Sequence, residues 1–101
     1  MKIIVVGGTG TIGTAVADVL AAGHEVIRVG NRSGDFTVDF SDKRSIEDLF
    51  KQIPSFHALV SAAGKAKFAK LGDLSDEDFL FSLNHKLMGQ VNLVRIGHHY
   101  I

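Results

Sequence analysis

The fold is decided by the stretch Ile3-Ile4-Val5-Val6-Gly7-Gly8-Thr9-Gly10-Thr11-Ile12-Gly13. Its apolar start predicts a buried strand, its glycines predict a turn, and the residues after the turn have helical spacing as far as Leu20. A strand, a glycine-rich turn and a helix in this order form the arrangement that binds the pyrophosphate of a dinucleotide. The alternative is a purely structural turn, because glycines also occur in simple connections.

Each glycine of the turn has its own physical task. Gly7 allows the chain to turn sharply after the strand, Gly10 lets phosphates approach the main chain, and Gly13 lets the helix pack closely on the strand. The free N–H groups at the start of the helix then face the phosphates, with the positive end of the helix dipole behind them. Threonine hydroxyls add hydrogen bonds. The predicted phosphate-binding residues are Gly7, Thr9, Gly10, Thr11, Ile12 and Gly13.

Length and composition limit the classes of protein to consider. The 101 residues suffice for one domain but are few for a complete doubly wound fold, which contains two mononucleotide-binding halves. A hydrophobic content of 46% supports a packed core. The 11 basic residues balance the 11 acidic ones, so we expect neither nucleic acid nor an anionic membrane surface as a partner.

The remaining composition argues against several kinds of site. Cysteine is absent, which excludes a disulfide framework, a thiol nucleophile and a zinc-thiolate site. Among the histidines only His98 and His99 are adjacent, and neighbours one apart in a helix point to different faces, so we expect no metal site. No apolar run approaches the roughly 20 residues of a membrane span, and a signal-peptide layout is missing. We therefore expect a cytoplasmic protein.

Periodicity predicts an α/β fold of the Rossmann type, a doubly wound parallel sheet represented by its N-terminal half, with about four strands and flanking helices. The predicted strands are residues 2–6, 25–29, 36–40 and 57–61. The predicted helices are residues 12–20, residues 42–53 with Ser41 or Asp42 as the N-cap, and one long helix after the capping box at 75–78. The faces expected to be buried are Ile12, Val16, Val19 and Leu20; Ile46, Leu49, Phe50 and Ile53; and Phe79, Leu83, Leu87, Val91 and Val94.

The choice of coenzyme depends on the end of the second strand. A carboxylate in this region accepts a hydrogen bond from the ribose 2′-hydroxyl of NAD. The segment Gly30-Asn31-Arg32-Ser33-Gly34 contains no acid, whereas its arginine and serine can bind a 2′-phosphate. We therefore predict NADP rather than NAD as the cofactor, held in part by Asn31, Arg32 and Ser33. A solvated turn with a surface arginine is the alternative.

With these elements in order, the chain resembles the N-terminal, cofactor-binding half of a short-chain dehydrogenase/reductase over essentially all of its length. The glycine motif has the Gly-x-x-Gly-x-x-Gly spacing that is commoner in the extended and atypical branches of that family. Val38-Asp39-Phe40-Ser41-Asp42 is similar to the segment whose aspartate contacts adenine, which implies that role for Asp39. Ser61-Ala62-Ala63-Gly64 stands where the family usually has Asn-Asn-Ala-Gly, and it adds Ala62, Ala63 and Gly64 to the predicted cofactor site.

The resemblance also implies a chemistry, namely hydride transfer between a nicotinamide ring and a small carbonyl or alcohol substrate. Asn84 matches the helix asparagine that supports the family's proton relay. From its position in an amphipathic helix alone, this residue is either partly buried with hydrogen-bond partners or exposed to solvent. The family's acid-base pair is Tyr-x-x-x-Lys, but the single tyrosine here is Tyr100, one residue before the end. We therefore expect residues 1–101 to form one NAD(P)-binding domain that is truncated before the catalytic half and inactive alone.

Two functions remain open at this stage. The first is an NADP-dependent oxidoreductase whose catalytic half lies outside this chain. The second is a non-catalytic NAD(P)-binding module or redox sensor, which the departures at Ser61 and Ala62 favour. The oligomeric state stays open; the resemblance offers a homo-oligomer through the helix predicted after residue 75 as one option, since long helices of this kind pair between subunits in the family.

Overall fold

A computed structural model describes residues 1–53, 55–63 and 69–101 of the chain. Its centre is a parallel sheet in the order β3-β2-β1-β4 within the described residues. The strands are β1 (Lys2–Val6), β2 (Glu25–Gly30), β3 (Phe36–Thr37) and β4 (Ala58–Ser61). The helices are α1 (Thr11–Ala21), α2 (Lys43–Gln52), α3 (Asp76–Ser82) and α4 (Gly89–Gly97), with the 3-10 turn η1 (Leu71–Asp73) and the π-helical segment η2 (Leu83–Met88).

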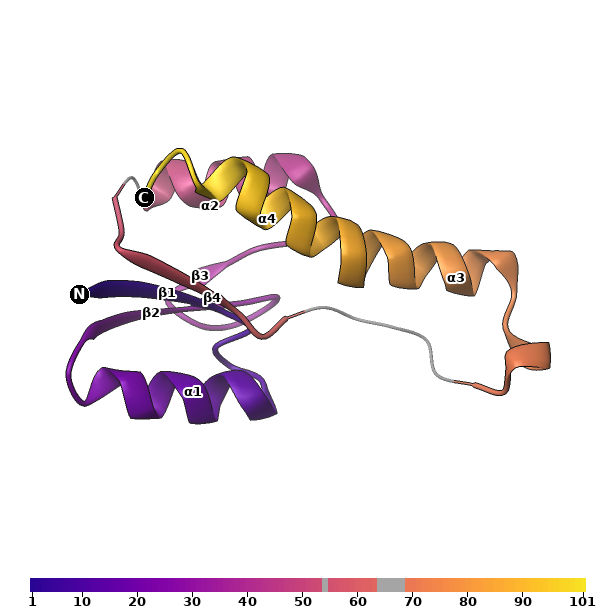
Figure 1. Cartoon of the computed structure of the whole chain (residues 1–101), viewed down its shortest axis with the longest axis horizontal. Helices are drawn as coiled ribbons and strands as arrows, with labels where there is room; N and C mark the ends of the chain where they lie inside the picture. Colours follow the sequence, from indigo (N-terminus) through magenta and orange to yellow (C-terminus); the bar gives the residue numbers. More distant parts are fainter. Residues whose placement is uncertain (54, 64–68) are drawn as a thin grey trace.

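The sheet is covered by helices on both faces (Figure 1). Helix α1 lies on one face, while α2 and α4 lie together on the other. Strand β1 is central and its side chains from Ile3 onward are buried, as expected for a parallel strand between two helical layers. The larger core contains the buried side chains Ile4, Ile46, Leu49, Phe50 and Leu93. The predicted doubly wound α/β architecture is therefore confirmed.

Local capping signals in the sequence are confirmed in the structure. Asp42 is the N-cap of α2, and its carboxylate accepts a hydrogen bond from the Arg44 N–H at 3.0 Å. Ser75 and Asp78 form the predicted capping box of α3. The predicted buried face of α2 is also correct, with its four members at most 2% exposed: Ile46, Leu49, Phe50 and Ile53. Pro54, the expected stop signal of this helix, lies outside the described residues.

The predicted extent of the third strand is wrong, because β3 ends at Thr37 instead of Phe40. The Asp39 carboxylate accepts hydrogen bonds from the hydroxyl and the N–H of Ser41, and the Asp39 N–H donates to the Ser45 hydroxyl. These short-range bonds use groups that a continuing strand would need for its ladder. The chain leaves the sheet at this point and reaches the N-cap of α2.

The predicted buried face of α1 is wrong in part. Ile12 and Val19 are 72% and 76% exposed, whereas Gly13 and Ala17 are buried against the sheet. Val16 and Leu20 are only half-buried. The reason is steric: a Cβ at Gly13 would overlap the Gly7 carbonyl oxygen, so the helix approaches the turn through its smallest side chains.

The predicted long C-terminal helix is present without a break from Asp76 to Gly97, although its buried face is not the predicted one. It consists of three consecutive segments, and α3 projects beyond the sheet (Figure 1), which gives the molecule extents of 46 × 26 × 19 Å. Gly89, Leu93 and Gly97 are the buried residues of α4. The two glycines pack directly on phenylalanine rings of the core, so closely that an added Cβ would overlap them. The predicted stripe is largely exposed, with Phe79, Leu83, Leu87 and Val94 between 46% and 62% accessible and Val91 half-buried.

Candidate functional site

The glycine-rich turn lies at the carboxyl ends of the parallel strands, between β1 and α1. Gly7 has φ +85°, which favours glycine, and a Cβ there would lie 2.7 Å from the Ala62 carbonyl carbon. The turn is tied to β2, since the Gly7 N–H donates to the Val29 carbonyl at 2.7 Å and the Gly8 N–H donates to it at 3.1 Å. This close approach brings the ends of β1, β2 and β4 together.

The N-terminus of α1 differs from those of α2 and α3. Its N-cap is Gly10, which has no side chain to cap the helix, and the first turn contains no acidic residue. By contrast, α2 and α3 are capped by the side chains of Asp42 and Ser75. The start of α1 therefore presents N–H groups and the positive end of the helix dipole without a competing carboxylate, which suits a phosphate group.

A cavity of about 230 Å³ lies beside this helix start. Its walls come from the glycine turn, from the residues that end β2 and β4, and from the segment after β3. The predicted residues that line it are Gly7, Thr9, Gly10, Asn31, Asp39, Ala62 and Ala63. Ligands of open α/β sheets bind at this edge, where the strand order reverses. In this sheet β2 and β4 lie on opposite sides of β1, so the reversal point is the cavity itself.

The Asp39 carboxylate is held at the cavity wall by local bonds. It accepts from the Ser41 hydroxyl at 2.7 Å and from the Ser41 N–H at 3.1 Å. The residues on either side, Val38 and Phe40, are 4% and 7% exposed and form apolar walls of the same cavity. A carboxylate fixed between two apolar side chains can accept a hydrogen bond from an amino group while a planar ring rests on the apolar wall.

The other predicted site residues that the structure describes do not line the cavity. Thr11 and Ile12 are exposed on the first turn of α1, and Gly13 packs on Gly7. Arg32 and Ser33 are exposed on the loop after β2. Asn84 is exposed too, which is the solvent-facing alternative of the two that the sequence left open. Gly64 lies outside the described residues.

Sequence reasoning missed His85, which lines the cavity from the helical side. It lies in the π-helical segment η2, where the Gly89 N–H donates to the Asn84 carbonyl. Its ring is half-buried, with its centroid 4.4 Å from that of Phe81. The π-helical turn changes the angular position of each residue, so a regular 3.6-residue period does not predict that His85 faces the cavity. Other lining residues that the sequence did not single out are Val6, Val29, Gly30, Val38 and Phe40.

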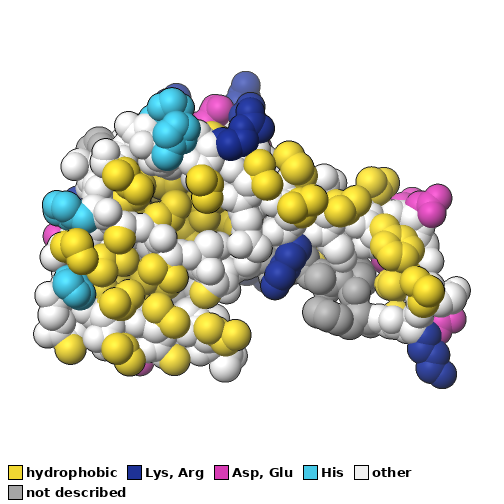
Figure 2. All heavy atoms as spheres, in the orientation of Figure 1, with side chains coloured by type: hydrophobic (Ala, Val, Ile, Leu, Met, Phe, Trp, Pro, Cys, Tyr) yellow, Lys and Arg dark blue, Asp and Glu magenta, His cyan; other side chains and the backbone are white. Residues whose placement is uncertain are grey.

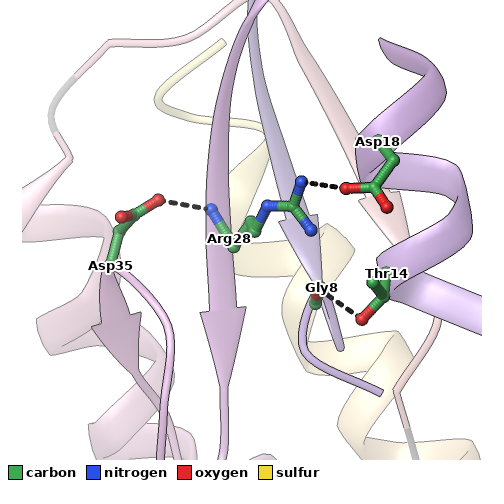
Figure 3. A network of polar contacts seen from close by, with 5 residues as sticks. All are labelled: Gly8, Thr14, Asp18, Arg28 and Asp35. Carbon is green, nitrogen blue, oxygen red and sulfur yellow. Dashed lines mark hydrogen bonds and ion pairs between the residues drawn. The ribbon is translucent and has the colours of Figure 1, made fainter. Parts of the chain in front are cut away.

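A polar network supports the turn from the side of α1 (Figure 3). The Thr14 hydroxyl donates to the Gly8 carbonyl at 3.4 Å, and the Arg28 guanidinium pairs with the Asp18 carboxylate at 2.5 Å. The Arg28 N–H donates to the Asp35 carboxylate, which lies on the far side of β2. The network therefore connects α1, β2 and the segment that begins β3.

Other kinds of site find no support among residues 1–53, 55–63 and 69–101. No group of three His, Cys, Asp or Glu residues there is arranged to hold a metal ion. No helix in this part of the chain is long and apolar enough to cross a membrane. Tyr100 is half-buried and packs against the core, where its ring stacks on Phe50 with a centroid distance of 5.6 Å.

Comparison with known proteins identifies the family and the fold of this chain. The model of the NAD dependent epimerase/dehydratase family matches residues 3–99. A solved structure of a protein from Listeria innocua is 41% identical with a TM-score of 0.96, over 99% of this chain and 50% of that one. A small-chain dehydrogenase in complex with NADPH is 27% identical, with a TM-score of 0.89, over 100% of this chain and 46% of that one. No curated protein matches.

A further solved structure, a short chain dehydrogenase/reductase family protein, is 27% identical with a TM-score of 0.88, over 98% of this chain and 48% of that one. The chain thus spans about half the length of these proteins. The family match covers nearly every residue, and the fold match includes all the elements that surround the cavity. The chain belongs to the NAD-dependent epimerase/dehydratase family of nicotinamide-dinucleotide-binding proteins, and it has the fold of the N-terminal half of a short-chain dehydrogenase.

Proposed function

We propose that this chain is the cofactor-binding half of an NADP(H)-dependent oxidoreductase of the short-chain dehydrogenase type. The observation that carries the proposal is the cavity at the carboxyl ends of β1, β2 and β4, beside a helix N-terminus without a side-chain cap. The glycine turn and α1 hold the pyrophosphate through the residues predicted above, Gly7, Thr9, Gly10, Thr11, Ile12 and Gly13. Asp39, Ala62, Ala63 and Gly64 complete the pocket for the nucleotide.

The preference for NADP is supported by the loop at residues 31–34. Arg32 and Ser33 are exposed there, next to Asn31, which lines the cavity. The nearest acid in the sequence is Asp35, but its carboxylate accepts a hydrogen bond from the Arg28 N–H and is not part of the cavity wall. The loop therefore offers a guanidinium and a hydroxyl to a 2′-phosphate, and it offers no carboxylate to a ribose 2′-hydroxyl.

Calorimetric titration with NADPH and NADH tests the proposal. We expect NADPH to bind more tightly, and we expect Arg32→Ala to reduce the ratio of the two affinities by about tenfold or more, because a hydrogen bond to a charged group contributes about 1.5–3 kcal/mol. Arg95→Ala is the matched control, since Arg95 lies on α4 away from the cavity. A folded protein that binds neither nucleotide contradicts the proposal. Equal binding of both contradicts the preference for NADP.

The catalytic step is proposed for a longer protein that contains this half. Asn84 is assigned to the proton relay, and the substrate is a small carbonyl or alcohol. Support for Asn84 comes from its π-helical segment, next to His85 at the cavity, because such segments are frequent at functional sites. In the full-length protein, Asn84→Ala should reduce turnover more than NADPH affinity. The 101 residues alone should bind the coenzyme without oxidising it when a carbonyl substrate is supplied.

The second candidate function is a non-catalytic NAD(P)-binding module or redox sensor. It is favoured by Ser61 and Ala62, which replace the two asparagines usual in the family. A Tyr-x-x-x-Lys motif about 30 residues beyond Ile101 in the encoding message would contradict this alternative. A cytoplasmic location belongs to the main proposal, because the reaction consumes an intracellular coenzyme. Fractionation of the source cells checks it.

We also propose a homo-oligomer that forms through the C-terminal helical segments. Hydrophobic side chains gather along the projecting arm in Figure 2, and Phe79, Leu80, Leu83 and Leu87, the arm patch, are 46–56% exposed. Leu83→Asp should convert the assembly to monomers in sedimentation velocity. Val19→Asp is the control, because Val19 is exposed on α1 instead. A wild-type protein that stays monomeric at all concentrations contradicts this proposal.

A further inference from the structure

The connection between β2 and β3 is unusually short for a parallel pair. Parallel strands are ordinarily joined by a crossover of a dozen or more residues, but only residues 31–35 separate these two strands. Val29 is paired with Phe36 and Gly30 with Thr37, so the chain returns along β2 within this loop before it runs forward again. Asp35 therefore arrives beside Arg28, one pair before the ladder begins.

Asp35 closes this loop with two hydrogen bonds to a single residue. Its N–H donates to the Arg28 carbonyl at 2.8 Å, and its carboxylate accepts from the Arg28 N–H at 2.9 Å. The Asp35 carboxylate thus accepts the hydrogen bond from the Arg28 N–H that a main-chain carbonyl of β3 would accept if β3 were longer. Figure 3 shows Asp35 pointing at the Arg28 N–H from the side of β3.

Arg28 is itself a fixed anchor. On one side its guanidinium pairs with Asp18 of α1, and on the other side its main chain holds Asp35 (Figure 3). The Cβ and Cα of Arg28 also lie close to Gly8, where an added Cβ would come within 3.1 Å of both. The loop is therefore attached to a strand position that also supports the glycine turn.

The closed loop folds onto the rim of the cavity. An added Cβ at Gly30 would overlap both the Ser33 carbonyl oxygen and the Thr9 hydroxyl, so both groups lie close over Gly30. Gly34 has φ +108° where the chain turns back. Asn31, at the start of the loop, lines the cavity. Arg32 lies between Asn31 and Ser33, so the hydrogen bonds between Asp35 and Arg28 that close the loop also hold its main chain in place.

We infer that Asp35 is a positioning residue for coenzyme selection: its bond to the Arg28 N–H holds the loop 31–34 at the cavity rim and keeps Arg32 where a 2′-phosphate would bind. The coenzyme part of this inference rests on the proposed function, whereas the fixing of the loop does not. Asp35 does not contact the coenzyme, because it is not part of the cavity wall. It acts through Arg32 and Ser33.

Asp35→Ala and Asp35→Asn separate this role from the charge of the carboxylate. Removing a negative charge near the loop would by itself favour NADPH in both variants. Loss of the hydrogen bond acts only in Asp35→Ala, because the Asn side-chain oxygen can still accept from the Arg28 N–H. We therefore expect Asp35→Ala to lower the ratio of NADPH affinity to NADH affinity by about fivefold, and Asp35→Asn to stay within about twofold of the wild type.

Limited trypsin digestion gives a second measurement that needs no coenzyme. Cleavage after Arg32 requires the loop to open, so we expect about fivefold faster cleavage there in Asp35→Ala and little change in Asp35→Asn. Asp48→Ala, on the exposed side of α2, is the control for removing an aspartate elsewhere.

The outcomes distinguish the two proposals. Unchanged cleavage and an unchanged affinity ratio in Asp35→Ala overturn the inference, and so does a rise in NADPH affinity in both variants. A wild-type protein that binds neither nucleotide overturns the proposed function and with it the coenzyme part. The cleavage rates then still decide whether Asp35 fixes the loop.

Discussion

Gly13→Ala is expected to abolish dinucleotide binding and to lower the free energy of unfolding by more than about 2 kcal/mol. A methyl group on Gly13 would overlap the Gly7 carbonyl oxygen and would lie 2.5 Å from the Gly7 carbonyl carbon. These are main-chain atoms of the glycine turn, which cannot rotate away as a side chain can. Relief requires α1 to move away from the turn, and that motion displaces the N–H groups proposed to face the phosphates.

Gly23→Ala is the matched control for this substitution. Apart from its two chain neighbours, no described residue has a heavy atom within 4 Å of an added Cβ at Gly23, and its φ is not positive. Alanine restricts the unfolded chain, so this variant should be neutral or more stable by up to about 1 kcal/mol. Urea denaturation and NADPH titration of both variants make the comparison. Normal NADPH binding by Gly13→Ala would contradict the proposed role of the turn.

Phe50→Ala is expected to lower the free energy of unfolding by about 3–5 kcal/mol, because it removes a large buried side chain and leaves a cavity. Phe50 is fully buried, and its ring stacks on Phe56 and Tyr100 at centroid distances of 5.6 Å. Gly97 of α4 also packs on this ring. Since small domains are stable by about 5–15 kcal/mol, this loss removes a large share of the total.

Denaturation followed by far-ultraviolet circular dichroism measures the effect of Phe50→Ala. Leu71→Ala serves as the comparison, since Leu71 is 78% exposed and its loss should change stability by less than about 0.5 kcal/mol. Two variants of equal stability would mean that Phe50 does not join α2 to α4 and to the segment before β4, as the structure indicates.

The parts of the fold that depend on neighbouring residues could be predicted from the sequence. The strand, turn and helix at residues 2–21 were predicted because the glycines and the apolar run lie next to each other. The N-cap at Asp42 and the capping box at Ser75 are likewise local. The buried face of α2 was predicted because its large apolar residues are the ones that pack into the larger core.

The faces of α1 and of the C-terminal helix could not be predicted from large apolar residues. At Gly13 on α1 and at Gly89 and Gly97 on α4, the helix approaches its neighbours through the smallest side chains. A periodicity based on large residues therefore selects a different face, and it selected Ile12 and Val19 on α1. Only the distance between layers decides which face is buried, and that distance is a tertiary property.

The candidate site was predictable to the extent that it follows the glycine motif and the strand ends. Asn31 and Ala62 are predicted in this way and Asp39 by the family resemblance, and all three line the cavity. His85 was not, because its position depends on the π-helical register of η2. The early end of β3 was missed for a different reason, since the apolar pattern of residues 36–40 does not reveal that short-range hydrogen bonds between Asp39 and Ser41 compete with the ladder.

The pairing of β1 with β4 has a consequence for the order of folding. Strand β1 pairs with β2 after one short helix, but Ile3 meets Ala58 only when the distant second half of the chain has arrived. Local contacts form quickly, and closing a long loop is slow. The unit of β1, α1 and β2 should therefore collapse first and carry the glycine turn from the beginning. Because Ala62 and Ala63 follow β4, the cavity is completed last. A nucleotide therefore binds only to chains that have finished folding.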